Sequence, residues 1–451
     1  MIDTRTEYEN HWEHFNARKE DELHHNFKKE RLHDSLDEEF FGESTSTFKD
    51  DFGAPKKNVQ DSFDAACNYA SNCWNQFKDV FIDWISIVPV FVHTLVLPCS
   101  FFLMLVHALF YNFTWAGCAL YLISIALDSR AYSGIPLNGI QKFVRRSVWW
   151  KWFAAYYPIT LHKTCDLEPS DPPIRESKTF VDTSFYYLFA WPLILVRNIV
   201  QWIFRSETNS QNDSDTPKRP GKRYIFACSP HGIICMGAFC ALGTEGCRWS
   251  KLFPGITTRV LTLGLCFNAP FYRQYLFLTG CCSVSKKSCI NLLNNNQSIC
   301  IIIGGTRESL MTEPGKFDLI LKSRRGVIKV ALETGASVVP VLSFGENDVY
   351  NADAQGRDSI WYKLNCLLSS SLGFAVPRFI GRGLFDKCAG PLPFRRPINV
   401  VVGRPIDVPL IENYTKSDID KYQNIYISEL TKLYEENVDK YTPGVSLRIV
   451  E

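Results

Sequence analysis

Short apolar strands alternate with amphipathic helices from Arg223 to the C-terminus, and this rhythm constrains the fold more than any other feature. Runs rich in β-branched residues predict strands at Tyr224–Cys228, Arg259–Cys266, Ser298–Gly304, Ser337–Ser343 and Ile398–Val402. Helical periodicity predicts helices at Lys287–Asn294, Arg325–Thr334 and Asp418–Asp439, with Ser417 as the N-cap of the last one. Such alternation is typical of an α/β domain, so residues 223–451 are predicted to form a mostly parallel sheet with flanking helices.

A run with almost no charge precedes this domain. From Phe81 to Leu127 there is no Lys or Arg, and Asp83 carries the only formal charge. A membrane-spanning helix needs about 20 apolar residues, so the run is long enough for two spans. Basic residues flank both ends, at Lys78, Arg130, Lys142, Arg145, Arg146 and Lys151. By the positive-inside rule, residues 76–130 are predicted to form an N-terminal transmembrane hairpin with both ends in the cytosol; a re-entrant wedge in one leaflet is the alternative.

Two further segments complete the predicted organisation. Residues 1–75 are rich in charged side chains and poor in aliphatic ones, which predicts a disordered cytosolic arm. Residues 131–222 have the composition of a membrane-interface segment, in which basic side chains accompany Trp149, Trp150, Trp152, Phe153, Tyr156 and Tyr157. The apolar run at 184–196 is too short to span a bilayer and predicts an interfacial helix, and a polar loop follows at 206–222.

Charge and cysteine content argue against two classes of ligand. The chain has 49 Lys and Arg residues against 47 Asp and Glu residues, so it lacks the basic excess typical of nucleic-acid binding. Its 16 cysteines are scattered through apolar runs, and the spacing of Cys235, Cys240 and Cys247 fits no common zinc pattern. Neither a nucleic-acid partner nor a metal site is therefore expected.

The strongest catalytic candidate is His231. It follows a predicted buried strand, in the turn Ser229-Pro230-His231-Gly232, and α/β sheets place their working residues at such strand ends. The chain has nine histidines, and His231 is the only one beyond His162. Because imidazole titrates near neutral pH, His231 is predicted to act as a general base, against the alternative of a buried histidine that stabilises a turn.

A second turn of interest follows the predicted strand at Ser298–Gly304. Gly304 and Gly305 would let backbone N–H groups approach an anion, and Arg307 beside them can bind phosphate. The turn lacks the lysine and the spacing of a P-loop, so nucleotide hydrolysis is not supported. A basic cluster follows at Lys322, Arg324, Arg325 and Lys329. The two features together predict a ligand with phosphates at one end and apolar bulk at the other.

Taken in order, these blocks resemble the diacylglycerol acyltransferase 2 family, a branch of the glycerolipid acyltransferases. The matching blocks are Ser229-Pro230-His231-Gly232, Phe253-Pro254-Gly255, Gly304-Gly305-Thr306-Arg307-Glu308-Ser309, Phe344-Gly345-Glu346-Asn347, Arg382-Gly383-Leu384-Phe385 and Val402-Gly403-Arg404-Pro405-Ile406. The segments 296–300 and 397–403 are most similar to the fungal members. The resemblance runs from about Phe81 to the C-terminus, with an interruption near 166–221.

The resemblance implies that a fatty acyl group passes from acyl-coenzyme A to the free hydroxyl of diacylglycerol. No cofactor is implied, because acyl-coenzyme A is a substrate. The implied catalytic residues are His231 as base, Ser229, Gly232 and Glu308, with Glu308 or Glu245 orienting His231. The implied substrate contacts are Pro230, Gly304, Gly305, Arg307, Arg324, Arg325 and Lys329, together with Lys322. The family also implies a multi-pass protein of the endoplasmic reticulum membrane and of lipid droplets, and the sequence leaves open whether it forms a homo-oligomer.

The chain departs from the family pattern at three places. Ser229 stands where the family usually has a histidine, and its hydroxyl is expected to support catalysis. Phe102, Leu103 and Leu105 resemble a motif proposed to bind neutral lipid, but Leu109 replaces the asparagine of that motif. The insertion at 166–222 is longer than expected.

Three other functions stay open. Within the same class, the acceptor would be monoacylglycerol or a long-chain alcohol, which gives a wax ester. A lipid hydrolase is disfavoured because the sequence has no Gly-x-Ser-x-Gly elbow. The Ser229 departure leaves room for a catalytically weak lipid-droplet protein.

Overall fold

A seven-stranded sheet forms the centre of the molecule. The computed structural model describes residues 85–96, 106, 115–170, 222–352, 360, 363–365, 367, 377–383 and 389–450. The strand order is β1 (Ile159–Lys163), β11 (Ile398–Val402), β7 (Ser337–Phe344), β2 (Tyr224–Ser229), β5 (Ser298–Ile302), β3 (Thr258–Thr262) and β4 (Cys282–Ser283). All neighbours pair in parallel except β11 and β7. The predicted α/β fold with a mostly parallel sheet is confirmed.

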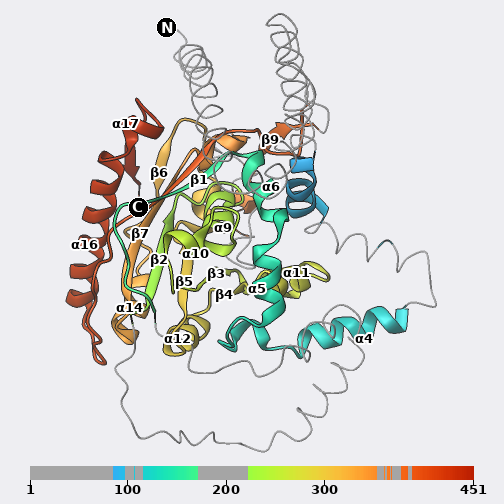
Figure 1. Cartoon of the computed structure of the whole chain (residues 1–451), viewed down its shortest axis with the longest axis horizontal. Coiled ribbons are helices and arrows are strands. Elements are labelled where there is room, and N and C mark those ends of the chain that lie inside the picture. Colours follow the sequence, from blue (N-terminus) through green and yellow to red (C-terminus); the bar gives the residue numbers. More distant parts are fainter. Residues whose placement is uncertain are drawn as a thin grey trace, which may run out of the picture. The chain divides into compact units, whose positions relative to one another are not determined.

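Helices cover both faces of this sheet, so its central strands are buried on both sides. Every residue of β2 and β7 is buried. Figure 1 shows α16 (Lys416–Glu435) and α14 (Gly326–Thr334) on one side and α9 (Met236–Gly243) and α6 (Val148–Tyr156) on the other. Alternate residues of β2 enter two separate cores: Phe226 and Cys228 pack with α9, and Ile225 and Ala227 pack with α14 and α16.

Shorter elements surround the sheet. Further described helices are η3 (Arg130–Tyr132), α5 (Gly139–Arg146), α10 (Trp249–Leu252), η4 (Gly264–Asn268), α11 (Tyr272–Leu278), α12 (Lys286–Asn294), α13 (Gly305–Ser309), η5 (Glu346–Val349) and α17 (Val438–Tyr441). A small antiparallel sheet joins β10 (Ala389–Gly390), β9 (Phe379–Arg382) and β8 (Asn351–Ala352). A parallel pair joins β12 (Leu447–Ile449) to β6 (Phe317–Leu319).

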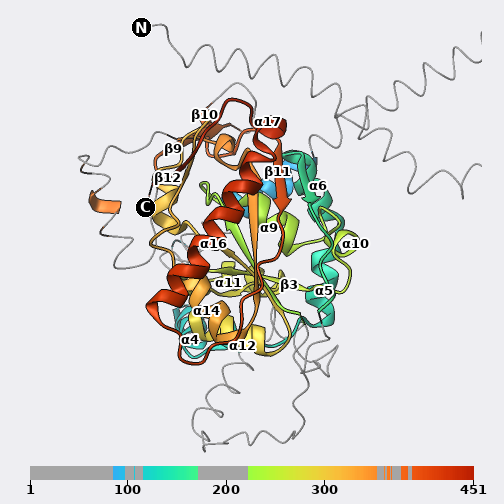
Figure 2. The same cartoon turned by 90° about the vertical axis from the view of Figure 1, so that its left-hand side faces the viewer.

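The predicted strands are all present, and the boundaries of most of them differ by one to four residues. Ile398–Val402 matches its prediction, whereas β3 ends at Thr262 and a 3-10 helix, η4, begins at Gly264. The predicted last helix is divided into α16 and α17. Ser417 is not its N-cap: Thr415 caps α16, and a reciprocal pair of hydrogen bonds with Asp418 completes a capping box. Figure 2 shows α16 crossing in front of the sheet.

The aromatic segment for which the sequence predicts a membrane interface is largely part of the core. Trp150, Phe153, Tyr156 and Tyr157 are at most 1% exposed. Trp150 packs against Phe239 of α9 with ring centroids 5.6 Å apart. The interface prediction is therefore wrong for these four side chains, because aromatic composition does not distinguish a lipid face from a protein core.

The edge strand β1 also comes from this segment. It pairs in parallel with β11 through five residues, from Ile159 with Ile398 to Lys163 with Val402. The sheet therefore includes residues that precede the predicted domain start at 223. Pairing across such a separation in sequence leaves no local signal, so the predicted boundary lies too late in the chain.

Several predictions fall on residues that the structure does not describe. These are the arm at 1–75, the apolar run at 184–196, the loop at 206–221, and Phe102, Leu103 and Leu105. Of the charge-free run, the structure describes helical residues at 85–96, including η1 (Val92–Val96), Val106, and α4 (Trp115–Ala126) with Leu127. Within the described parts of the chain, no helix has the length and apolar character needed to cross a membrane.

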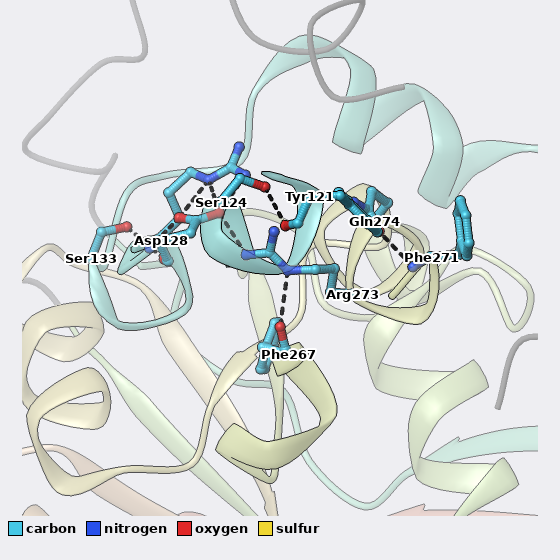
Figure 3. Close-up of polar contacts among 9 residues, drawn as sticks. Tyr121, Ser124, Asp128, Ser133, Phe267, Phe271, Arg273 and Gln274 are labelled. Atoms are coloured by element: carbon cyan, nitrogen blue, oxygen red, sulfur yellow. Dashed lines mark hydrogen bonds and ion pairs between the residues drawn. The ribbon is translucent and has the colours of Figure 1, made fainter. Parts of the chain in front are cut away.

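Polar contacts attach α4 to the α/β domain, as Figure 3 shows. The Tyr121 hydroxyl accepts hydrogen bonds from the backbone N–H of Phe271, at 3.0 Å, and from the side-chain amide of Gln274, at 2.6 Å. Just beyond the helix, the buried carboxylate of Asp128 forms an ion pair with Arg273 at 2.7 Å. The opposite face of α4 is exposed and apolar, with Trp115 55% and Ile123 48% exposed.

Candidate active site

His231 lies on the loop that joins the C-terminal end of β2 to the start of α9. The side chain is half-buried, and its Nδ1 lies 3.1 Å from the carbonyl oxygen of Gly232 and 3.4 Å from Sγ of Cys235. A carbonyl oxygen can only accept, so Nδ1 carries the proton and the lone pair is on Nε2. Burial, more than the charge of Arg324, lowers the pKa of His231. The ring is therefore a neutral base near pH 7 with its basic nitrogen fixed.

Glu308 holds the backbone of this loop. It lies in α13, after β5, and is 2% exposed. Its Oε1 accepts from the backbone N–H of His231 at 2.6 Å, and its Oε2 accepts from that of Ile320 at 2.8 Å. Burial raises the pKa of Glu308 to about 7 despite these hydrogen bonds.

Neither carboxylate that was expected to orient the imidazole contacts it. Glu308 bonds to the main chain of His231, not to its ring. Glu245 is engaged elsewhere, where its Oε2 accepts from the backbone N–H and the hydroxyl of Ser250. The main chain of Gly232 supplies the orienting acceptor, which no side-chain pattern in the sequence could indicate.

The two glycines of the second turn make room for Glu308 and Arg324. A Cβ on Gly304 would coincide with the carboxyl group of Glu308, and Gly305 has a φ of +66°. The guanidinium of Arg324 donates to the carbonyl oxygen of Gly304 at 2.9 Å. The structure thus brings His231, Glu308, Gly304 and Arg324 together.

The other basic residues of the cluster are placed differently. Arg325 forms an ion pair with Asp420 of α16 at 2.8 Å. Arg307, Lys322 and Lys329 are exposed. Arg324 is therefore the basic side chain that contacts the Gly304-Gly305 turn and whose charge acts on His231, and Arg325 forms a contact with α16. Among the described residues, no group of three or more His, Cys, Asp and Glu side chains could hold a metal ion.

Ser229 does not contact the imidazole. It is fully buried at the end of β2, and its position in the strand alternation points its side chain toward α16. There it neighbours Tyr426. Burial raises the pKa of the Tyr426 hydroxyl, and the nearby Ser229 hydroxyl lowers that pKa by a smaller amount. The two hydroxyls face each other without the geometry of a hydrogen bond to any described residue. The expected supporting role of the Ser229 hydroxyl is not reflected in this geometry.

Replacing Ser229 by alanine is therefore expected to change turnover by less than about twofold, because the change removes no well-formed hydrogen bond. The measurement is the specific activity of the purified variant beside that of Tyr426→Phe, which removes the facing hydroxyl. A drop of about tenfold or more in Ser229→Ala alone would show that this hydroxyl does act on the reaction.

Glu346 is a residue of the site that sequence reasoning missed. It follows β7 and is 1% exposed. Its Oε1 accepts from the backbone N–H of Met236 at 2.7 Å, and its Oε2 accepts from that of Gly237 at 2.8 Å. Burial raises the pKa of Glu346 to about 7. The available signal was the block Phe344-Gly345-Glu346-Asn347, in which a glutamate follows a mostly apolar strand after one glycine, Gly345, whose φ is +90°.

Comparison with known proteins shows which family the chain resembles. A family model described as diacylglycerol acyltransferase matches residues 107–174 and 208–449. A Saccharomyces cerevisiae protein named diacylglycerol O-acyltransferase 1 is 39% identical over 78% of this chain and 83% of its own length. A protein of the same name from Schizosaccharomyces pombe is 36% identical over 80% of this chain and 90% of its own length. A Bos taurus protein named 2-acylglycerol O-acyltransferase 1 is 35% identical over 66% of this chain and 76% of its own length.

Proposed function

The chain belongs to the diacylglycerol acyltransferase family, and from this premise we propose how its residues transfer an acyl group from acyl-coenzyme A to diacylglycerol. It is a diacylglycerol O-acyltransferase that makes triacylglycerol, with acyl-coenzyme A and diacylglycerol as substrates. The observation that carries the mechanism is the hydrogen bond from Nδ1 of His231 to the Gly232 carbonyl. It leaves Nε2 as the basic nitrogen.

In this mechanism, Nε2 of His231 takes the proton from the free hydroxyl of diacylglycerol as the hydroxyl oxygen attacks the thioester carbonyl carbon. The new C–O bond forms, and the negative charge collects on the former carbonyl oxygen. When this intermediate collapses, the C–S bond breaks and the coenzyme A thiolate takes the proton back from Nε2. General-base assistance of this kind accelerates reactions by about 10²–10⁴-fold.

The groups around His231 supply the other functions. Backbone N–H groups near Gly232 or at the Gly304-Gly305 turn stabilise the oxyanion. Arg324 provides a positive charge beside the Gly304-Gly305 turn, and the exposed Arg307, Lys322 and Lys329 extend a basic surface for the coenzyme A phosphates. Pro230 lies between Ser229 and His231 and completes the substrate-facing turn.

Diacylglycerol resides in membranes, so the enzyme works at a lipid surface. We assign residues 76–130 to the membrane hairpin, 1–75 to a cytosolic arm and the apolar run at 184–196 to the membrane interface, with the endoplasmic reticulum and lipid droplets as the location. The exposed apolar face of α4 supports this assignment, because a helix that is apolar on all sides needs a nonpolar partner. Phe102, Leu103 and Leu105 keep their proposed contact with neutral lipid.

Monoacylglycerol is the second candidate acceptor, and the similarity to the Bos taurus 2-acylglycerol O-acyltransferase favours it over a long-chain alcohol. The deciding experiment supplies labelled acyl-coenzyme A with diacylglycerol, monoacylglycerol or a long-chain alcohol and separates the products. Labelled triacylglycerol should dominate. Predominant labelling of diacylglycerol or wax ester would reassign the acceptor, and no labelled product would favour a structural lipid-droplet protein.

Replacing Arg324 by alanine should raise the KM for acyl-coenzyme A about tenfold and leave that for diacylglycerol nearly unchanged, because one charge-assisted hydrogen bond to phosphate is lost. Arg307→Ala should act in the same direction but less, since Arg307 is exposed. The matched control is Arg325→Ala, which removes an adjacent arginine that is paired with Asp420. If only the diacylglycerol dependence shifts, Arg324 does not bind the coenzyme.

A further inference from the structure

The loop that carries His231 is held from two neighbouring strands of the sheet. Glu308, after β5, accepts from the backbone N–H of His231 at 2.6 Å. Glu346, after β7, accepts from the backbone N–H groups of Met236 and Gly237, where the loop enters α9. Because β5 and β7 flank β2 in parallel, their C-terminal ends place both carboxylates beside this loop.

Glu346 takes the place of a local helix cap. The N-cap position of α9 is Cys235, which has a φ of 55° and forms no side-chain capping bond. Asp, Asn, Ser or Thr at that position would usually satisfy the first N–H groups of the helix from within the loop. Here the cap comes from a different strand, so the start of α9 is coupled to the end of β7.

The Glu346 side chain also contacts Gly232, whose carbonyl group orients the imidazole of His231. Gly232 has a φ of +57°, and a Cβ built on it would lie 2.8 Å from Cγ of Glu346 and 3.2 Å from the Glu346 carbonyl oxygen. The backbone of Gly232 is therefore in close contact with the side chain and the carbonyl group of Glu346. Its own carbonyl oxygen accepts the Nδ1 proton of His231. The position of Glu346 thus sets the position of the acceptor that selects the tautomer of His231.

We propose that Glu346 is a positioning residue for the acyl transfer: it fixes the Gly232 peptide and the start of α9, and through them keeps Nε2 of His231 unprotonated and directed at the acceptor hydroxyl. This inference rests on the proposed role of His231 as the general base. Glu346 does not touch substrate or the imidazole; it acts through the loop. No ion pair to Glu346 exists in the part of the chain that the structure describes, so its bonds to the backbone are its polar anchorage.

The test compares Glu346→Gln and Glu346→Asp with Asp348→Asn in the full-length protein in detergent micelles. Gln keeps the volume but can accept only one of the two N–H groups, whereas Asp keeps both acceptor oxygens on a shorter side chain. Asp348 is the matched control, because it is a carboxylate of the same short helix, η5, that accepts from the backbone N–H of Gly315 at 2.8 Å, away from the His231 loop.

Three quantities are measured: kcat, the KM for acyl-coenzyme A, and the rate at which diethyl pyrocarbonate modifies His231, followed by mass spectrometry of the peptide. His162 of β1 is the internal reference for the modification, since its ring contacts Asn399 instead of the loop. We expect Glu346→Gln to lower kcat about ten- to a hundredfold with little change in KM, because one buried hydrogen bond is lost. His231 should be modified severalfold faster, His162 at an unchanged rate, and Glu346→Asp should be intermediate.

Unchanged kcat and unchanged His231 modification in Glu346→Gln would overturn the proposal. Equal losses in Glu346→Gln and Asp348→Asn would also overturn it, since they would reflect general destabilisation. If Glu346→Gln does not accumulate as folded protein, the Glu346→Asp variant decides by the same criteria. Activity in His231→Ala would disprove the proposed role of His231 as the general base. The modification rate of His231 in the Glu346 variants would still show whether Glu346 positions this side chain.

Discussion

Replacing His231 by alanine should lower kcat by about 10²–10⁴-fold, the usual contribution of a general base. The loss follows from the geometry, because the ring is half-buried with Nδ1 bound to the Gly232 carbonyl and Nε2 left as the proton acceptor. The fold should survive, since the ring makes a single hydrogen bond to the main chain and its removal costs about 1 kcal/mol. The measurement is turnover of labelled acyl-coenzyme A by purified protein.

The matched control for this change is His162→Ala. His162 is likewise half-buried, and its Nε2 lies 3.1 Å from the Asn399 side-chain oxygen. It should keep near-normal turnover, because it lies on the edge strand β1 instead of the catalytic loop. Near-normal turnover in His231→Ala would disprove the catalytic assignment, whatever the control shows.

Replacing Glu308 by alanine should cause the largest loss of stability among the site residues. The change leaves the backbone N–H groups of His231 and Ile320 unpaired in a buried position, at about 1–3 kcal/mol each. Glu308→Gln, which keeps one acceptor oxygen, should cost about half as much. Turnover should fall in both variants, because the backbone of His231 loses its anchor. The unfolding midpoint in detergent, measured beside Glu245→Gln as the control, checks the order.

The raised pKa of Glu308 gives this prediction a pH dependence with a definite sign. Burial raises the pKa from 4.5 to about 7, so between these values the folded protein holds a proton that the unfolded chain has released. The free energy of unfolding therefore falls as pH rises through this window. Glu308→Gln lacks this titration. The stability advantage of the wild type over this variant should shrink from about pH 5 to about pH 7; a constant difference would contradict the raised pKa.

Local patterns in the sequence were sufficient to predict five of the seven strands of the sheet and the strand end that carries His231. Ile398–Val402 is rich in β-branched residues, which predicts a buried strand, and it forms β11. The turn Ser229-Pro230-His231-Gly232 follows an apolar run and carries a histidine, and His231 lies at the C-terminal end of the buried strand β2. Gly304 and Gly305 were predicted to let backbone N–H groups approach an anion; in the structure the side chains of Glu308 and Arg324 lie against these glycines, and the contact with an anion stays a prediction.

What the tertiary structure alone decided is which partner each of these residues meets. Alternation along β2 predicts that Ser229 and Cys228 point to opposite faces, but only the packing of α16 places Tyr426 opposite Ser229. Trp150 and Tyr156 belong to a segment whose composition is typical of a membrane interface, but both side chains lie in the core. Composition does not show whether lipid or another part of the protein covers a segment. Glu346 reaches the His231 loop because β7 pairs with β2 in parallel, a contact between residues more than a hundred positions apart. The sequence determines local secondary-structure preferences and which face of a strand or helix each side chain occupies. The pairing of strands that are distant in the sequence decides which side chains share a site.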